Sequence, residues 1–183
     1  QAASRLIRVT EVLLKAQYGG KDALQWGLKL SKQYDSFVDA WITVLKETYA
    51  EDGLDLDLRQ TQEVLNQLFP DKLPEFAQEK PEDYLKALQK DYRNIVRYCL
   101  SNRKLDLPKA RCAKIALTVA QPGRGLADAW IKLFEFLTES KGPELTTATA
   151  LDLATEIALH GSAAVDSWIQ AYRFALAEKG LKN

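Results

Sequence analysis

The chain has 183 residues, of which 46% are hydrophobic, so it can bury one substantial core and falls within the usual size of a single domain. Lys and Arg together number 25, as do Asp and Glu, so no overall charge draws the protein to nucleic acid or to an anionic membrane. The absence of any run of about 18 apolar residues argues against a transmembrane helix, and we expect one soluble, cytoplasmic domain over residues 1–183.

The first predicted helix covers residues 4–18. Its apolar residues recur near helical spacing, which places them on one side of the helix. Two consecutive glycines, Gly19 and Gly20, follow and predict its end. We expect this helix to cover the first unit of the repeat that begins after it.

A four-residue frame containing tryptophan occurs three times along the chain. Its copies are Asp39-Ala40-Trp41-Ile42, Asp128-Ala129-Trp130-Ile131 and Asp166-Ser167-Trp168-Ile169. A glycine follows twelve residues after each tryptophan, at Gly53, Gly142 and Gly180. The last two tryptophans are 38 residues apart, a period typical of stacked helical hairpins that share a continuous core.

The residues before each frame also match. Small or apolar residues stand eleven, fourteen and fifteen places before every tryptophan, as on one helical face. Each unit is therefore predicted to be a pair of helices, over residues 21–53, 110–142 and 148–180. The second helix of each pair is expected to begin near the aspartate of the frame and to stop at the glycine in a left-handed conformation. An apolar or aromatic residue four places after each tryptophan favours a core anchor over an aromatic ligand cage.

Residues 54–109 are predicted to lie outside the repeat. We expect a helix over about residues 59–69, then a stretch broken by two prolines, and then a long helix from Pro81 to Ser101 with proline at its favoured first position. The whole chain is thus predicted to be all-α, with about nine helices in antiparallel hairpins that stack as a repeat-built bundle or short solenoid.

Charge is segregated along this scaffold. Residues 45–86 carry a net charge of −6, and residues 87–115 carry +6. The cations proposed to bind a partner or phosphate are Lys90, Arg93, Arg97, Arg103, Lys104, Lys109 and Arg111. Tyrosines interleave with them, a composition found on surfaces that bind single-stranded nucleic acid. The other interpretation is a solvated helical face that pairs with the neighbouring acidic segment.

The usual catalytic patterns are missing. The single histidine, His160, stands at the predicted end of a helix, and a metal site built on imidazoles needs more than one. Neither Cys99 nor Cys112 lies in a nucleophile motif, and both are expected to be free thiols. A DNA-reading helix is disfavoured because the candidate begins with Asp128, which phosphate would repel. We expect no catalytic residues, no cofactor and no metal.

These observations favour a non-enzymatic interaction module, an adaptor or assembly subunit, which binds another protein or its own copies through a helical surface with separate acidic and basic patches. The alternative is a nucleic-acid-associated subunit that contacts the phosphate backbone through the basic segment 87–115. A third class is an enzyme that relies on carboxylates or on a bound cofactor.

Overall fold

The computed structural model describes residues 1–102 and 105–178, and within these ranges the protein is all-α, with ten helices and no strand. The helices are α1 (Ala2–Lys15), α2 (Gly20–Ser31), α3 (Asp35–Tyr49), α4 (Leu58–Leu68), α5 (Glu75–Gln78), α6 (Pro81–Ser101), α7 (Lys109–Ala120), α8 (Ala127–Thr138), α9 (Thr147–Ala158) and α10 (Ser162–Glu178). The helix beyond the nine predicted is α5, a single turn within the proline-broken stretch. No described helix combines the length and the apolarity needed to cross a bilayer.

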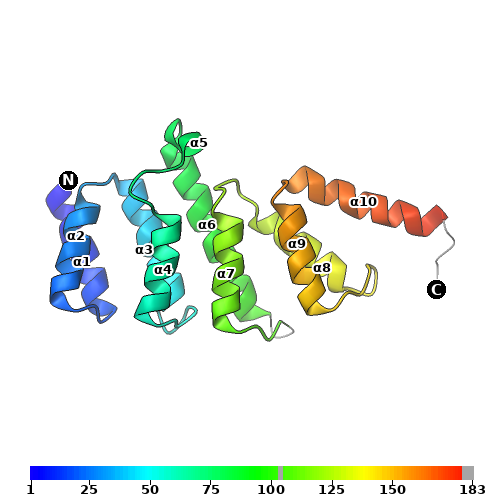
Figure 1. Ribbon diagram of the computed structural model, residues 1–183, viewed down its shortest axis with the longest axis horizontal. Helices are drawn as coiled ribbons and strands as arrows, with labels where there is room; N and C mark the ends of the chain where they lie inside the picture. Colours follow the sequence, from blue (N-terminus) through cyan, green and yellow to red (C-terminus); the bar gives the residue numbers. More distant parts are fainter. Residues whose placement is uncertain (103–104, 179–183) are drawn as a thin grey trace.

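The helices form an elongated array of two layers, with α1 and α10 at opposite ends of the array (Figure 1). One layer contains α2, α4, α7 and α9, and the other contains α1, α3, α6, α8 and α10. Successive long helices alternate between the layers, so the chain advances along the array one hairpin at a time. This confirms the predicted class of stacked helical hairpins.

The closest helix pairs lie one helix earlier than the predicted units. The three units correspond to α2–α3, α7–α8 and α9–α10, whereas among helices that follow one another in the chain the most extensive packing occurs in α1–α2, α6–α7 and α8–α9. Gly27 on α2 allows α1 and α2 to pack closely, because a side chain at this position would overlap the hydroxyl of Thr10 on α1. Helices α2 and α3 still meet through Trp26 and Trp41, whose ring centroids are 5.5 Å apart.

Residues 54–109 supply a helix to each layer. Helix α4 begins with a capping box, in which the Asp57 carboxylate accepts the backbone N–H of Gln60 at 2.8 Å. Helix α6 has the bounds predicted from the sequence and lies between α3 and α8. Its Tyr92 is fully buried, with the hydroxyl 2.7 Å from that of Thr48 on α3. The segment between the first two predicted hairpins is therefore part of the stack.

The three repeated tryptophans differ in burial. Trp41 and Trp130 are 1% and 0% exposed, and Trp168 is only partly buried. Trp130 stacks on Phe134 with ring planes 3° apart, and Trp168 stacks in the same way on Tyr172 at 10°. All three indoles pack as core residues, as the helical spacing predicts.

Helices α3 and α8 end alike, but not in the conformation we predicted. After each helix the glycine N–H donates to a carbonyl three residues earlier, Gly53 to Ala50 and Gly142 to Glu139, each at 2.9 Å. Neither glycine has a positive φ. Instead, a Cβ at Gly53 would lie 2.5 Å from the Glu47 carbonyl oxygen, and one at Gly142 would overlap the carbonyl oxygen of Phe136. Close approach of the backbone, rather than left-handedness, therefore requires these glycines; Gly180 lies outside the described residues.

The frame aspartates also differ from expectation. Only Asp128 is in the first turn of its helix, because α3 and α10 each begin about one turn earlier than predicted. Asp39 instead pairs with Arg8 on α1, and Asp166 pairs with Lys132 on α8, both at 2.7 Å. In these two copies the aspartate therefore joins its helix to the preceding helix of the same layer.

Candidate functional site

The predicted basic segment is divided between two helices and a loop. Lys90, Arg93 and Arg97 are exposed on α6, and Lys109 and Arg111 begin α7. The other two candidates, Arg103 and Lys104, lie outside the described residues.

Arg93 and Arg97 share one carboxylate. They are four residues apart on α6, and their Nε atoms lie 3.3 Å and 2.8 Å from the two oxygens of Glu47 on α3. The Glu47 side chain is only 6% exposed. Arg97 also donates to the backbone carbonyl of Asp52 at 2.9 Å. Burying a carboxylate is costly unless an opposite charge lies beside it, so the two arginines have a structural role in joining α3 to α6.

Of the other three described cations, two also form ion pairs within the molecule and one does not. Lys109 lies 3.4 Å from Asp55, and Arg111 lies 3.8 Å from Asp152 on α9. Lys90 has no ion-pair partner among the described residues. The opposite charges of residues 45–86 and 87–115 therefore meet within the molecule, and of the five described candidates only Lys90 keeps an unpaired charge.

A buried aspartate links α6 to α8. Asp91 is 2% exposed, and its carboxylate accepts the backbone N–H groups of Leu126 and Ala127 at 2.9 Å and 3.0 Å. These N–H groups lie at the start of α8 and have no partner within that helix. Burial raises the pKa of the Asp91 carboxyl, although the hydrogen bonds act to lower it. This interaction ties two neighbouring helices of the same layer.

The groups considered for catalysis are not brought together. His160 is exposed after the end of α9, while Cys99 and Cys112 are free thiols on α6 and α7. A hydrogen bond from Cys112 lowers the pKa of the Cys99 thiol. Within residues 1–102 and 105–178, no group of three or more His, Cys, Asp or Glu side chains is placed to hold a metal ion.

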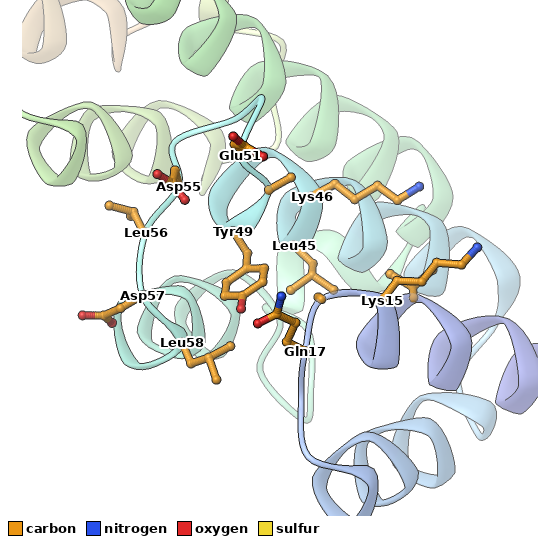
Figure 2. A pocket seen from close by; sticks show the side chains of 13 residues that line it. Lys15, Gln17, Leu45, Lys46, Tyr49, Glu51, Asp55, Leu56, Asp57 and Leu58 are labelled. Carbon is orange, nitrogen blue, oxygen red and sulfur yellow. The ribbon is translucent and has the colours of Figure 1, made fainter.

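A concavity lies where α1 and α3 end and α4 begins. This α1–α3 pocket has a volume of about 960 Å³. Its lining residues are Val12, Lys15, Ala16, Gln17, Leu45, Lys46, Tyr49, Ala50, Glu51, Asp55, Leu56, Asp57 and Leu58. Figure 2 shows Tyr49 at its centre, between Gln17 and Leu58.

The pocket has an apolar floor and a charged rim. Lys15 and Lys46 lie on one side, with Asp55 and Asp57 on the other (Figure 2). Gln17 and Asp55 have φ values of 60° and 51°, a left-handed conformation uncommon for residues other than glycine. Non-glycine residues held in this conformation cluster at functional sites.

A second concavity adjoins the pocket. The α2–α4 groove has a volume of about 720 Å³ and shares Leu58 with the α1–α3 pocket. Tyr18 and Trp26 line it together with the amide side chains of Gln25, Gln62 and Asn66. The Tyr18 hydroxyl is buried without a hydrogen-bond partner, and burial raises its pKa to about 12. The two concavities thus meet at Leu58, the first residue of α4.

Sequence reasoning missed this pocket because its lining comes from two helix ends and a loop. In the sequence, residues 51–57 stand out only by their acidic composition. Their local signal was the Asp57 to Gln60 spacing of a capping box, which fixes where α4 begins and hence the pocket edge. No protein-family model, no curated protein and no solved structure matches this chain.

Proposed function

We propose that this protein is a non-enzymatic interaction module, an adaptor or assembly subunit that binds a segment of another protein. The observation that carries the proposal is the α1–α3 pocket, which combines an apolar floor with a charged rim at the edge of an elongated helical array. Arrays of this kind expose long surfaces that suit protein recognition. The proposal includes a cytoplasmic location, which is supported by the two free thiols.

Nucleic-acid binding through residues 87–115 is less well supported. Phosphates would have to displace Glu47 from Arg93 and Arg97, and Asp55 from Lys109. A salt titration with oligonucleotides distinguishes the two functions, because several phosphate contacts make affinity fall steeply with ionic strength. Tight binding at about 50 mM salt that is lost at 200 mM would favour nucleic acid over the proposal.

Site-specific photocrosslinking tests the proposal directly. A photoreactive amino acid replaces Leu58, which is 39% exposed at the pocket, and a matched control replaces Leu24, which is 49% exposed on α2 outside both concavities. Discrete adducts with other proteins are expected from position 58 after nuclease treatment, and not from position 24. The same adducts from both positions, or none from position 58, would contradict the proposal.

A further inference from the structure

We propose that Cys99 and Cys112 form a reversible oxidation site, in which peroxide oxidises the Cys99 thiol and Cys112 then closes an intramolecular disulfide. The two thiols lie near the end of α6 and the start of α7, and they line neither the α1–α3 pocket nor the α2–α4 groove. The site therefore goes beyond the proposed function and does not depend on it.

The α6–α7 hairpin holds the two cysteines at the same level. Cys99 lies two residues before Ser101, the last residue of α6, and Cys112 lies three residues after Lys109, the first residue of α7. The two helices run antiparallel and pack closely (Figure 1), so residues equally far from the connection lie opposite one another. A side-chain hydrogen bond joins the two thiols and places their sulfur atoms next to each other. The chain has two cysteines in all, so an intramolecular disulfide can form in only one way.

The two thiols have unequal surroundings, which gives them different roles. Cys112 is 2% exposed, whereas Cys99 is only partly buried against the core and is the more accessible to a small oxidant. The hydrogen bond from Cys112 lowers the pKa of the Cys99 thiol, while the same contact and burial raise the pKa of Cys112. The thiolate is the form that attacks an oxidant, and redox-sensitive thiols typically lie next to a second cysteine that resolves them. Cys99 is thus the sulfur that reacts first, and Cys112 is the resolving sulfur.

The reaction balances with one molecule of hydrogen peroxide. The Cys99 thiolate attacks one peroxide oxygen and breaks the O–O bond, which gives Cys99 sulfenic acid and hydroxide, and the hydroxide becomes water with the proton that the Cys99 thiol has lost. The Cys112 sulfur then attacks the Cys99 sulfur, so that an S–S bond forms and the hydroxyl on Cys99 leaves as a second water with the Cys112 proton. The two thiols together lose the two electrons that peroxide gains. Two molecules of a small thiol such as glutathione reverse the step and are themselves oxidised to a disulfide.

The test treats the full chain with hydrogen peroxide and then locates its cysteines by mass spectrometry. After the remaining thiols are blocked, digestion without reductant is expected to yield a single crosslinked peptide pair, joined through Cys99 and Cys112. The crosslink should be found in monomeric protein, and glutathione should restore both thiols. The oxidised chain should also melt at a higher temperature than the reduced chain, because the bond closes a ring over residues 99–112 and restricts the unfolded chain.

Two variants assign the two roles. In Cys112→Ala, dimedone is expected to trap sulfenic acid at Cys99, which has no cysteine left to resolve it. This sulfenic acid should form several-fold more slowly than thiols are lost in wild type, because the hydrogen bond that favours the Cys99 thiolate is absent. In Cys99→Ala, the buried Cys112 should keep its thiol under the same exposure. Cys99→Ser and Cys112→Ser replace an alanine variant that circular dichroism shows to be unfolded, and the mapping of wild type needs no variant.

Survival of both thiols in the folded protein after peroxide treatment would overturn the proposal, as would oxidation that begins at Cys112. Disulfides that link two molecules, with Cys99 and Cys112 unjoined within each, would also overturn it. So would a lower melting temperature of the oxidised chain, because the bond would then distort the native hairpin. None of these results bears on crosslinking from position 58, which tests the proposed function separately.

Discussion

Helices α8 and α10 carry the same local arrangement in different surroundings. In each, the repeated tryptophan stacks on the aromatic ring four residues later. Trp130 on α8 is also covered by the edge of Tyr98 from α6, and its indole N–H donates to Thr155 of α9 at 3.0 Å. Trp168 meets the edge of Phe136 from α8, and no helix of the described chain lies on the far side of α10. Burial is therefore set by position in the stack rather than by the local frame.

The largest expected effect comes from truncating the two tryptophans. Trp130→Ala should lower the free energy of unfolding by about 3–5 kcal/mol, since it removes a fully buried ring and leaves a cavity. Trp168→Ala should cost about half as much, because this ring is only partly buried and its removal leaves a cavity that water can enter. Urea denaturation followed by circular dichroism measures both. Equal losses would show that the end helix is as tightly held as the interior one.

The contacts that join α8 to its two neighbours offer a second comparison. Asp91→Ala leaves two buried N–H groups without an acceptor and should cost about 2–3 kcal/mol. Asp166→Ala removes an exposed ion pair to Lys132, in which the two side chains are 53% and 61% exposed. Its cost should be at most about 1 kcal/mol. A double-mutant cycle between Asp166 and Lys132 isolates the pair and should give a value near zero.

The difference in the pH dependence of stability between wild type and Asp91→Asn should report on the Asp91 carboxyl. Because burial raises the pKa of this carboxyl above its unfolded value, its contribution to stability is fully present below the unfolded pKa and is lost as pH rises through the folded pKa. Wild type should therefore gain stability relative to Asp91→Asn as pH falls from 7 towards 4. A difference that is constant over this range, or that changes in the opposite direction, would contradict the assigned shift.

The turns after α3 and α8 both contain a glycine that lies close to a backbone carbonyl, so the same substitution in each turn should lower stability by a similar amount. Gly53→Ala and Gly142→Ala should each cost about 1–3 kcal/mol, because the added Cβ meets a backbone carbonyl that cannot move freely. Gly20→Ala is the control: nothing lies within 4 Å of its added Cβ at the start of α2, so stability should be unchanged or slightly higher. Thermal melts of the three variants suffice for this comparison.

Local features of the fold were predictable from the sequence where a short stretch determines them. Proline at the first position of α6 fixes its start, and the spacing of apolar residues identified the core face around each tryptophan. The turn at Gly53 was located correctly but given the wrong conformation. Its cause is the approach of a carbonyl six residues earlier, which no local propensity describes.

Features that depend on contacts between distant segments could not be predicted in this way. Glu47 looks like an ordinary acidic residue until α6 places two arginines against it. The register of the hairpins depends on which faces pack most closely, and in the sequence Gly27 is simply one of the small or apolar residues that precede Trp41. The basic segment was likewise identified by composition, whereas its available charge depends on partners brought from other helices.

The two-layer stack has a mechanical consequence. Each helix packs chiefly against its nearest neighbours, and α1 and α10 lie at opposite ends of the array. Tension applied between these two helices would therefore be carried by each pair of neighbouring helices in turn. Helix α10 packs against α8 and α9, and its contacts with α8 include a surface ion pair and ring contacts, so we expect this end of the array to yield first. The α1–α3 pocket, at the other end of the array, would keep its shape while the far end gives way.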